Sequence, residues 1–426
     1  MSGSSLQAPR GTRDFYPDDY RRREWLFDRF RGVARRYAFE EIDAPVLEHA
    51  DLFTRKAGEE IVDQLYHFEL HDRHLALRPE MTPQLARMVI ARAGGMAFPL
   101  RWFSVTQNWR YERMTRGRLR EHFQWNMDIW GEPDVTAEAE LISSIFTLLD
   151  DLSLPRDAVK VRINSRALLE ESLRTGVLAE KPEAFEPLCI LIDKIGKIGA
   201  ESVIDQLSDA SGPVGLEPTA AADVVALLEA RSLQEAAERG GRGSTALDEI
   251  ERLFELLDAY GVADRVTFDA SVVRGLAYYT GIVFEAFDTR GALRSICGGG
   301  RYDRLSETLG GKPLPAAGFG LGDVVVAELL SDLGLEPSLP RTLDDVVYAR
   351  EEEQRASAIA LATRLRGEGR QVELVLGKPS QKRALRDADR NGARRIWVLG
   401  PEEAARGLCW VRDLESGEQS EHPLPE

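Results

Sequence analysis

Residues 108–128 hold the groups of this chain that are best suited to chemistry. The segment starts Asn-Trp-Arg-Tyr-Glu, continues through an arginine-rich stretch, and ends His-Phe-Gln-Trp-Asn-Met-Asp. Successive side chains of a strand point to opposite faces, so the pattern predicts a strand, a loop and a second strand. Arg110 and Glu112 would share one face of the first strand. The second strand would place polar His122, Gln124, Asn126 and Asp128 on one face and apolar Phe123, Trp125, Met127 and Ile129 on the other.

The polar face of this hairpin combines permanent cations with acids and an amide. Arginine keeps its charge and presents a planar fork of donors that matches phosphate and carboxylate oxygens. A solvated sheet face is the alternative interpretation. We favour a site for a polyanion beside a small polar ligand, because the pattern aims five suitable groups at one space: Arg110, Glu112, Arg118, Gln124 and Asp128.

Length and composition indicate a globular protein of two or three domains. A chain of 426 residues is too long for a single compact core. Its 43% hydrophobic and 30% charged residues are ordinary for a soluble protein. No apolar run approaches membrane-spanning length and the first residues resemble no targeting segment, so we expect a cytoplasmic protein without membrane contact. The three cysteines are far apart, which favours reduced thiols.

The net charge of −16 counts slightly against a nucleic-acid partner, because phosphate contacts depend on Lys and Arg. A large enzyme needs only a local basic surface, and the acidic residues are spread through segments such as 217–257. Acidity therefore weakens the hypothesis of an RNA partner without excluding it.

The first part of the chain predicts a helix, an extended segment and a hairpin. Apolar residues recur at helical spacing from 18 to 37, between arginines that we interpret as a solvated face. Residues 39–47 contain Pro45, which cannot donate to a ladder and so favours an edge or an interface. Residues 64–78 predict a hairpin with His-Asp-Arg at its turn. Strand alternation would scatter the directions of its histidines, so we expect no metal site at His67, His71 and His74.

The rest of the chain divides into a helical block and a small α/β unit. Between 166 and 265, helical patterns broken by Gly and Pro indicate an inserted helical domain. Prolines at 337 and 340 indicate a linker. Beyond it, strands predicted at 344–349, 371–376 and 395–399 alternate with helices at 351–366 and 380–391, which is typical of a partly parallel sheet. The start of the second helix suits either nucleic acid or solvent, since it gathers Lys378, Gln381, Lys382 and Arg386.

Several segments resemble the histidyl-tRNA synthetase family of class II aminoacyl-tRNA synthetases. The hairpin at 108–128 resembles class II motif 2, and residues 39–47 resemble motif 1. Two segments resemble signatures peculiar to the family: Arg-Gly-Leu-Ala-Tyr-Tyr-Thr-Gly at 274–281 and Cys-Gly-Gly-Gly-Arg-Tyr-Asp at 297–303. Leu-Arg-Pro-Glu-Met-Thr at 77–82 and Gly-Thr-Arg-Asp-Phe at 11–15 follow the family's order. The resemblance runs almost from end to end.

The resemblance implies an α+β fold. We expect a class II synthetase-type antiparallel sheet with flanking helices, a helical insertion and a C-terminal α/β domain like an anticodon-binding domain. The expected parts are two catalytic segments at 1–165 and 266–334, the insertion at 166–265, a linker at 335–340 and the anticodon-binding domain at 341–426. In this family the insertion is thought to embrace the acceptor arm of tRNA, and motif 1 lies at the interface of a homodimer.

The resemblance also implies a reaction. The family activates L-histidine with ATP to histidyl-adenylate and pyrophosphate, and then transfers histidine to tRNA(His). Because a carboxylate attacks the α-phosphate, the site must neutralise two anions and the charge that gathers at phosphorus. By resemblance, Arg110 would hold the α-phosphate, Glu112 would orient the nucleotide and Arg118 would hold the outer phosphates. Arg274 would bridge the substrate carboxylate and the α-phosphate, so Arg110 and Arg274 are the expected catalytic residues. Mg²⁺ is expected through the ATP phosphates, with no separate metal site.

A histidine substrate needs acceptors for its ammonium group and partners for both ring nitrogens. By resemblance the ammonium group would meet Glu80, Thr82 and Gln124. The ring pocket would be lined by Asp128, Tyr278, Tyr279 and Tyr302, and we expect one member of the tyrosine pair to be core instead. The glycines at 298–300 remove side chains where the backbone must pass close to a ligand.

The chain departs from the family pattern at three places. Ala277 stands where the first signature usually has aspartate, and Asp128 where glutamate is frequent. Val325 falls where motif 3 usually supplies an ATP-binding arginine, so either another residue supplies that cation or nucleotide binding is weaker. The loop Arg-Met-Thr-Arg-Gly-Arg at 113–118 differs from the more frequent Arg-Pro-Gln-x-Gly-Arg, which leaves the acceptor-end preference open.

The strongest alternative is a catalytically inactive relative, the regulatory subunit of ATP phosphoribosyltransferase, which is similar to the synthetase catalytic domain and senses histidine. That family typically lacks the C-terminal domain, and a sensor needs no arginines that handle pyrophosphate. The C-terminal unit and the set Arg110, Arg118 and Arg274 therefore favour the ligase, whereas Val325 taken alone favours the sensor. A synthetase-like stress-sensing module normally belongs to a far longer chain.

Overall fold

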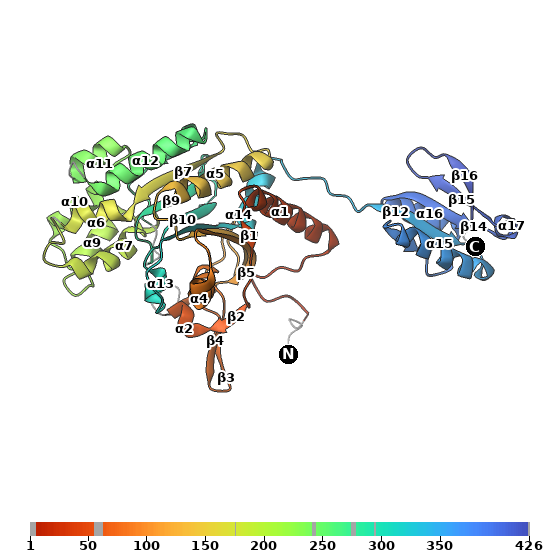
Figure 1. Ribbon diagram of the computed structural model, residues 1–426, viewed down its shortest axis with the longest axis horizontal. Coiled ribbons are helices and arrows are strands. Elements are labelled where there is room, and N and C mark those ends of the chain that lie inside the picture. The colour runs from red at the N-terminus through yellow and green to blue at the C-terminus, as the bar shows by residue number, and fades with distance from the viewer. Residues whose placement is uncertain are drawn as a thin grey trace. The chain divides into compact units, whose positions relative to one another are not determined.

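The structure, a computed structural model, describes residues 6–54, 63–174, 176–240, 244–273, 278–293 and 295–424 (Figure 1). The chain divides into two compact units. The second unit consists of Pro337–Glu426 together with Tyr16–Arg22, and the first unit contains the other residues. Within the described residues, no helix combines the length and the apolar character needed to cross a bilayer.

An eight-stranded sheet forms the centre of the first unit. Its order is β1-β5-β6-β11-β10-β9-β7-β8. The neighbours from β5 to β7 are antiparallel, and only the pairs β1–β5 and β7–β8 are parallel. The expected antiparallel sheet is therefore confirmed, with one parallel pair at each edge. The bounds are β1 Glu40–Glu41, β5 Leu100–Trp109, β6 Glu121–Trp130, β7 Val159–Ser165, β8 Val266–Phe268, β9 Ile282–Asp288, β10 Cys297–Arg301 and β11 Ala316–Gly322.

Four helices cover one face of this sheet and create the main core. They are α1 Pro17–Arg36, α5 Thr136–Asp151, α12 Thr245–Ala259 and α14 Asp323–Asp332. The apolar set predicted for the second strand of the hairpin faces them, since Trp125, Met127 and Ile129 are buried in the same cluster as residues of all four helices. The ring of Trp125 stacks on Phe30 of α1 with 5.3 Å between centroids. The alternation in β6 therefore fixes which face packs and which face stays polar.

The opposite face carries smaller elements. A three-stranded sheet has the order β2-β4-β3, with β2 Leu47–His49, β3 His67–Leu70 and β4 Arg73–Leu77. Beside it lie α2 Ala50–Thr54, α4 Thr82–Arg92, the 3₁₀ turn η1 Ala93–Gly95 and α13 Leu305–Thr308. Leu85 and Val89 of α4 share a buried cluster with Trp130 and Tyr302. Figure 1 shows α4 on the side of the sheet opposite α5 and α12.

The β3–β4 hairpin corrects two details of the sequence analysis. Its turn consists of His71 and Asp72 alone, both with positive φ (48° and 57°), as in a type I′ turn. Arg73 is already in β4. The expected scattering of the histidines is wrong for one pair, because His67 and His74 are diagonal neighbours on one face and their ring nitrogens lie 3.0 Å apart.

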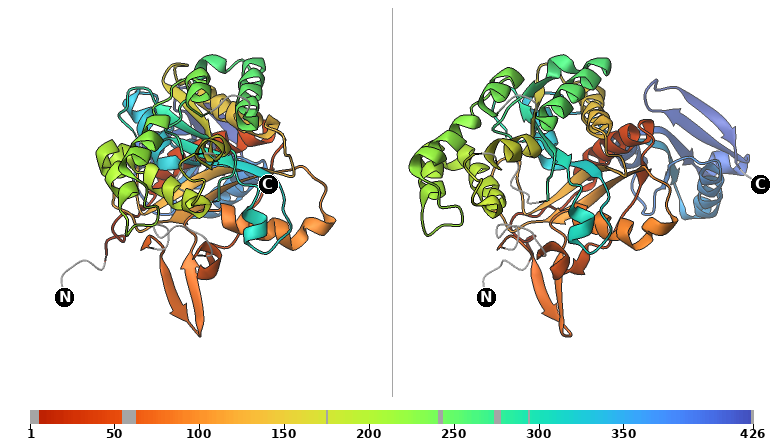
Figure 2. Two further views of the ribbon diagram at one scale, coloured as in Figure 1. Left: turned by 90° about the vertical axis from the view of Figure 1, so that its left-hand side faces the viewer. Right: turned by 60° about the vertical axis from the view of Figure 1, so that its left-hand side comes forward.

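The helical block forms between β7 and β8, as predicted. Its elements are α6 Arg166–Arg174, η2 Pro182–Ala184, α7 Phe185–Ile192, α8 Ile195–Ile198, α9 Ala200–Ser208, α10 Pro218–Leu227, α11 Leu233–Gly240, α12 and η3 Ala263–Arg265. Most of them share a separate core that includes Leu173, Leu188 and Val224, whereas α12 packs in the main core. Figures 1 and 2 show α6 to α11 gathered at the end of the sheet where β7 and β9 lie. The domain boundaries themselves stay a prediction.

The second unit is a five-stranded sheet with helices on both faces. The order is β13-β12-β14-β15-β16, parallel among the first three strands and antiparallel beyond them. This confirms the partly parallel sheet. α15 packs on Val347 and α16 on Val346, which alternate on β12. The bounds are β12 Leu343–Ala349, η4 Glu352–Gln354, α15 Arg355–Gly367, β13 Val372–Leu374, α16 Gln381–Arg390, β14 Ala393–Leu399, α17 Pro401–Ala405, β15 Leu408–Asp413 and β16 Gln419–Pro423.

Glycine determines how closely β10 and β11 can approach their neighbours. Gly318 and Gly320 lie opposite Asp128 and Asn126 on the polar face. A Cβ at Gly318 would collide with the Asp128 carboxylate, and one at Gly320 would collide with the Gln124 amide. Polar side chains of β6 therefore lie flat over Gly318 and Gly320 of β11. We call this part of the polar face, which carries no side chains, the glycine floor.

Gly299 is constrained on the other face of β10. A Cβ there would lie 2.5 Å from the Gly318 carbonyl oxygen, 2.5 Å from the Phe284 ring and 2.7 Å from Phe319 Cβ. Gly299→Ala should therefore lower the free energy of unfolding by roughly 1–3 kcal/mol, because the backbone of β11 must move. Urea unfolding followed by tryptophan fluorescence measures this.

The matched control is Gly32→Ala on α1, where a Cβ would meet open space. Alanine in a helix should raise the free energy of unfolding by about 0.5–1 kcal/mol. Equal stability of Gly299→Ala and the unaltered protein would contradict the close packing of β10 on β11.

Candidate functional site

The predicted amino-acid pocket stands on the glycine floor of the central strands. Asp128, at the middle of the sheet, is 2% exposed. Its carboxylate accepts a short hydrogen bond from the Tyr302 hydroxyl. Gln124, four residues earlier on the same face, accepts from the Asn108 amide at 3.2 Å. The structure thus places Asp128 and Gln124 on one face of β6 and brings Tyr302 into contact with Asp128.

Burial changes the protonation of the pair at the pocket's base. It raises the pKa of Asp128 from 3.8 to about 7, with the Glu80 charge adding to the rise and the Tyr302 hydrogen bond opposing it. Burial and the neighbouring Asp128 also raise the pKa of Tyr302 well above 10. Tyr302 is therefore a neutral donor, and Asp128 changes between acid and carboxylate near neutral pH.

The two tyrosines of the first signature lie in the segment before β9 and are not part of a strand. Tyr279 is buried in a cluster with Tyr302 and Leu85, as expected for a core member. Tyr278 is half-buried, and its hydroxyl donates to Glu80 Oε2 at 3.2 Å. The Tyr278 ring lies 5.8 Å from the Tyr302 ring. Tyr278 thus connects the pocket's base to the predicted ammonium-binding acid.

Glu80 and Thr82 lie at the beginning of α4, next to the arginine-rich loop. Glu80 is 6% and Thr82 8% exposed. Glu80 Oε2 lies 3.8 Å from Arg110 Nη2. The acid that would hold an ammonium group therefore lies between Tyr278 and Arg110, the first of the arginines predicted to bind phosphate.

The arginine-rich loop holds Arg110, Glu112 and Arg118 in mutual contact. Arg110 Nη1 lies 4.0 Å from Glu112 Oε1, and Arg118 donates a short hydrogen bond to the other oxygen of Glu112. Arg110 Nε also donates to the Pro79 carbonyl at 2.9 Å. A carboxylate between two guanidinium groups keeps both of them in place for a polyanion.

The strand geometry predicted for Arg110 and Glu112 is wrong. β5 ends at Trp109, and residues 110–112 are irregular. One more bond follows β5, from the Arg110 N–H to the Arg120 carbonyl at 2.9 Å, but the Arg120 N–H donates to the Gly11 carbonyl of the N-terminal segment instead of returning to Arg110. The ladder therefore ends there, although the Arg110 and Glu112 side chains still meet.

Arg13 belongs to an ion-pair group that was not predicted from the sequence. Arg13 Nε donates to Glu121 Oε1 at 2.8 Å and Nη1 donates to Asp323 Oδ2 at 2.9 Å. Both carboxylates are buried, and Asp323 Oδ1 accepts the Phe123 backbone N–H. Arg13 thus ties the N-terminal segment to the start of β6 and the start of α14. Its place in Gly-Thr-Arg-Asp-Phe was the only sequence signal.

His122 is a second residue whose role was not predicted. Burial, together with the charges of Arg110, Arg13 and Arg118, lowers its pKa to about 3. The imidazole is therefore neutral at physiological pH. It adds a polar group to the arginine cluster without adding another positive charge.

Arg301 and Tyr302 are consecutive, but their side chains lie on opposite faces of the sheet. Arg301 forms a buried bidentate ion pair with Glu138 of α5, at 2.7 and 2.6 Å. It also donates to the carbonyls of Glu132 and Asp134 at 2.9 Å each. This anchor fixes the end of β10, from which Tyr302 extends over Asp128. The remaining predicted residue, Arg274, and the departure at Ala277 lie outside the described residues.

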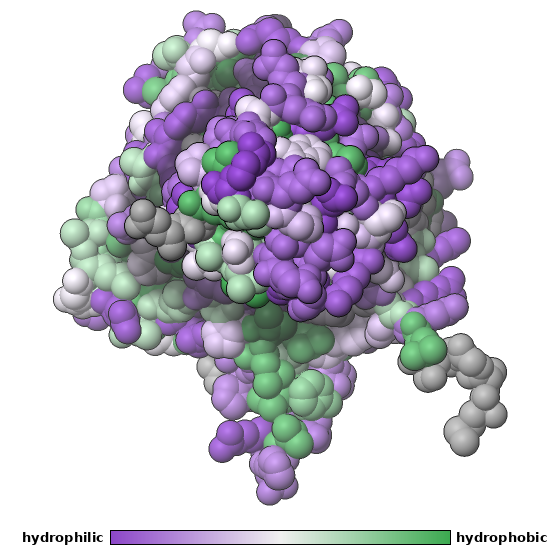
Figure 3. Space-filling model, turned by 90° about the vertical axis from the view of Figure 1, so that its right-hand side faces the viewer, coloured by the Kyte–Doolittle hydropathy of each residue, from purple (hydrophilic) through white to green (hydrophobic). Residues whose placement is uncertain are grey.

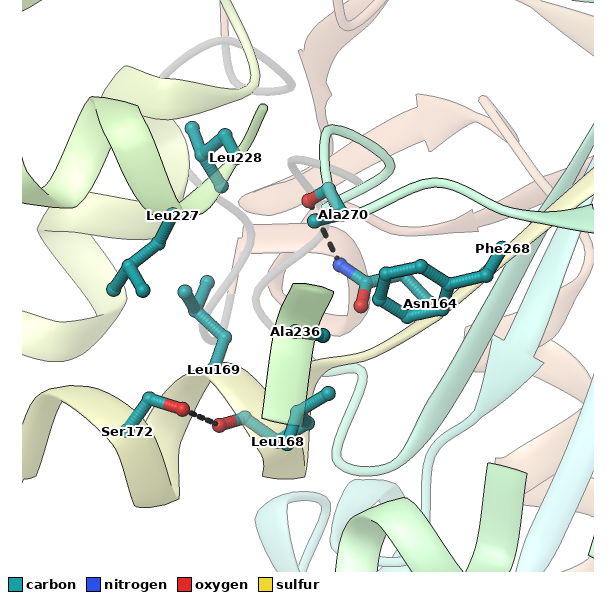
Figure 4. A pocket seen from close by; sticks show the side chains of 9 residues that line it. All are labelled: Asn164, Leu168, Leu169, Ser172, Leu227, Leu228, Ala236, Phe268 and Ala270. Atoms are coloured by element: carbon teal, nitrogen blue, oxygen red, sulfur yellow. Dashed lines mark hydrogen bonds between the residues drawn. The ribbon is translucent and has the colours of Figure 1, made fainter. Parts of the chain in front are cut away.

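Other candidate sites offer fewer side chains that could bind a ligand or react. A cavity of about 30 Å³ lies between the helical block and β7, and Figure 4 shows that most of its lining is apolar. Its polar groups are occupied, since the Asn164 amide donates to the Ala270 carbonyl and the Ser172 hydroxyl to the Leu168 carbonyl. In the part of the chain that the structure describes, no group of three or more His, Cys, Asp or Glu side chains is arranged to hold a metal ion.

The contacts form one continuous path across the polar face. It leads from Asp128 through Tyr302, Tyr278 and Glu80 to Arg110, and from there through Glu112 to Arg118. One end offers an acid and hydroxyls for a small polar ring, the middle offers a carboxylate for a cation, and the other end offers guanidinium groups for phosphates. This arrangement can hold a small zwitterion against a nucleotide.

Comparisons with known proteins agree with this arrangement. The family model described as Histidyl-tRNA synthetase matches residues 11–324, and the model described as Anticodon binding domain matches residues 345–426. The chain is 48% identical to the chloroplastic/mitochondrial histidine–tRNA ligase of Arabidopsis thaliana, over 97% of this chain and 84% of that protein. It is 36% identical to the histidine–tRNA ligase of Thermoplasma volcanium, over 97% of this chain and 95% of that protein. The crystal structure of histidyl-tRNA synthetase from Nostoc sp. shares the fold, with a TM-score of 0.75, 24% identity, and coverage of 98% of this chain and 97% of that chain.

The raised pKa of Asp128 predicts a pH-dependent effect of Asp128→Asn on stability. In the folded protein the acid stays protonated up to about pH 7, whereas in the unfolded chain it ionises near 3.8. The unaltered protein should therefore lose stability relative to Asp128→Asn as pH rises from about 4 to about 7, by at most about 1.4 kcal/mol per pH unit. Urea unfolding of both proteins at pH 5, 6, 7 and 8 measures this difference. A difference that stays constant with pH would contradict the raised pKa.

Proposed function

The chain belongs to the histidyl-tRNA synthetase family, and we propose that it acts as a histidine–tRNA ligase. It activates L-histidine with ATP, releasing pyrophosphate, and transfers the histidyl group to tRNA(His). The observation that carries this proposal is the contact between Glu80 and Arg110 at 3.8 Å. It joins a pocket suited to histidine to a loop suited to ATP, so the two substrates would meet at their reacting ends.

The pocket supports recognition of histidine through its ring and its ammonium group. Asp128 would accept from one ring nitrogen, with Tyr302 and Tyr278 as hydroxyl partners. Glu80, Thr82 and Gln124 would receive the ammonium group. Because Asp128 is buried, an amino acid whose side chain leaves it without a partner would bind poorly.

The arginine-rich loop supports binding of ATP. Arg110 would hold the α-phosphate and Arg118 the outer phosphates, while Glu112 would orient the nucleotide after its contacts with these arginines rearrange. As the carboxylate of histidine attacks, negative charge develops around the α-phosphorus, and preorganised guanidinium groups stabilise it. Arg274 would act as the second catalytic cation.

Mg²⁺ is expected to bind chiefly through the ATP phosphates. It commonly keeps several waters and uses few protein ligands. When bound, it would neutralise charge on the phosphates.

A homodimer and a cytoplasmic location belong to the same proposal. Apolar side chains are exposed on β2, on β3 and just before β2, at Val46, Leu47, Phe68 and Leu70, each between 37% and 48% exposed. Figure 3 shows apolar surface along the β3–β4 hairpin at the bottom of the view. A surface of this kind suits a partner subunit. Cys189, Cys297 and Cys409 are buried, and reduced thiols at these positions would suit a reducing compartment.

The C-terminal unit supports a role in tRNA binding. The anticodon-binding family model covers almost all of it. The same match argues against the alternative of a regulatory subunit of ATP phosphoribosyltransferase, a family that typically lacks this domain. The 48% identity to a histidine–tRNA ligase also favours the enzyme.

The first test is ATP–pyrophosphate exchange with each standard amino acid in turn. We expect L-histidine alone to stimulate exchange, because only its ring satisfies Asp128 and the tyrosine hydroxyls together. Phenylalanine, which lacks ring nitrogens, is the matched control and should be rejected by about 10⁴-fold or more. Comparable exchange with another amino acid, or none with histidine, would overturn the assignment.

Arg274→Ala should lower the rate of histidine activation by about 10²–10³-fold, as expected for the loss of one preorganised charge donor. Histidine binding should change much less. Single-turnover formation of histidyl-adenylate measures the first quantity and equilibrium dialysis the second. Near-normal single-turnover activation in this variant would remove Arg274 from the catalytic role.

A further inference from the structure

The tip of the arginine-rich loop is a tight turn. The Arg118 N–H donates to the Thr115 carbonyl at 3.0 Å, and the Thr115 N–H donates back to Arg118 at 3.2 Å. Arg116 and Gly117 form the two central positions. Gly117 has a φ of +74°, which is typical of the third position of a type II turn. Arg116 therefore projects from the tip, next to the predicted phosphate-binding Arg118.

One face of α14 receives this tip. Val325, Glu328 and Asp332 are spaced by three and four residues, so they lie on the same side of the helix. A Cβ placed on Gly117 would lie 3.6 Å from Val325 Cγ2, which means that the turn rests on this side chain. Arg116 Nε donates to Glu328 Oε2 at 2.8 Å, and Arg116 Nη2 forms a short hydrogen bond with Asp332. The loop tip is thus held by one apolar contact and two ion pairs.

The position of Asp332 is unfavourable for the helix itself. A carboxylate in the last turn opposes the helix dipole, which prefers cations there. Two arginines offset this charge, since Arg290 Nη2 also lies 3.6 Å from Asp332 Oδ2. The Asp332 carboxylate is therefore stabilised by guanidinium groups that come from other parts of the chain.

We propose that Arg116 is a positioning residue for ATP binding, which acts by docking the loop tip on Glu328 and Asp332 of α14. The inference rests on the proposed function, in which Arg118 meets the outer phosphates. Arg118 is the last residue of the docked turn, and its backbone is hydrogen-bonded to Thr115 at the other end of that turn. Fixing the tip therefore limits the positions that the Arg118 backbone can take before ATP arrives.

The strength of the docking sets the size of the expected effect. Arg116 is 51%, Glu328 37% and Asp332 20% exposed, so each ion pair is screened by solvent. An exposed ion pair of this kind contributes little free energy by itself, although one guanidinium group paired with two carboxylates stabilises more than a single pair does. We therefore expect the KM for ATP to rise by roughly three- to tenfold when the docking is removed.

Two sets of variants separate docking from direct contact with a ligand. Arg116→Ala removes the cation, and Glu328→Gln with Asp332→Asn removes its partners while leaving Arg116 intact. If Arg116 acts through α14, both should raise the KM for ATP to the same extent, and the triple variant should show no further rise. The kcat of exchange and the KM for histidine should stay within about twofold of the unaltered enzyme, as for loss of an interaction that serves ATP binding alone.

Arg156→Ala is the matched control. Arg156 forms an exposed ion pair with Asp264 at 2.8 Å and lies in neither the loop nor α14. Arg156→Ala removes a surface ion pair comparable to those of Arg116 and should leave the KM for ATP unchanged. Unfolding midpoints of all variants should agree, because only surface groups change.

Hydrogen exchange of the ligand-free protein gives a readout that needs no activity. Amides of residues 113–118 should exchange faster in Arg116→Ala and in the Glu328→Gln/Asp332→Asn variant than in the unaltered protein or Arg156→Ala. Unchanged exchange of these amides would overturn the docking itself. A higher KM in Arg116→Ala alone would show direct ligand contact and overturn the positioning role, as would additive effects in the triple variant. If the unaltered protein lacks histidine-dependent pyrophosphate exchange, the proposed function fails, and the amide data still decide whether the loop docks.

Discussion

The site depends on the lack of side chains along the polar face of β10 and β11. Gly318 and Gly320 allow the Asp128 carboxylate and the Gln124 amide to lie against the neighbouring backbone. Any larger residue there would push these groups out of the plane in which they meet Tyr302 and Asn108. The opposite face of the same strands is ordinary core, with Phe319 and Leu321 packed under the helices. One sheet thus provides a packed core on one face and the glycine floor of the predicted pocket on the other.

Charge in the site is balanced by contacts that come from distant parts of the chain. Glu112 and Glu80 lie beside Arg110, and the buried Glu121 and Asp323 neutralise Arg13. Neighbouring arginines and burial keep His122 neutral. The cluster can therefore exist before a polyanion binds, because each guanidinium already has a partner that a phosphate can replace or join. A site built in this way is preorganised for developing negative charge rather than assembled around it.

The arginine-rich loop is irregular, yet it is supported from several directions. The Gly11 carbonyl accepts the Arg120 N–H, which would otherwise continue the ladder between β5 and β6, and the Pro79 carbonyl accepts from Arg110 Nε. The face of α14 at Val325 supports the tip through Gly117. Val325 itself, where the family usually supplies an arginine, has become part of this support. The loop carries the residues predicted to bind ATP, while the sheet and helices around it determine where they lie.

The sequence by itself determined the local patterns: the alternation in β6, the glycines of β10 and β11, the helical block, and the alternating elements of the C-terminal unit. These follow from periodicity and composition within a few residues, which a sequence displays directly. The resemblance added residue roles, among them that of Arg274, which lies outside the described residues. Only the tertiary structure decided where β5 ends, which acids meet Arg13 and Arg116, and that His67 and His74 touch. Arg13 and Asp323 are separated by 310 residues and Arg116 and Glu328 by 212, so no local pattern links them. Such pairs form only because packing of the sheet and its helices brings their backbones together, and that packing is a property of the whole chain.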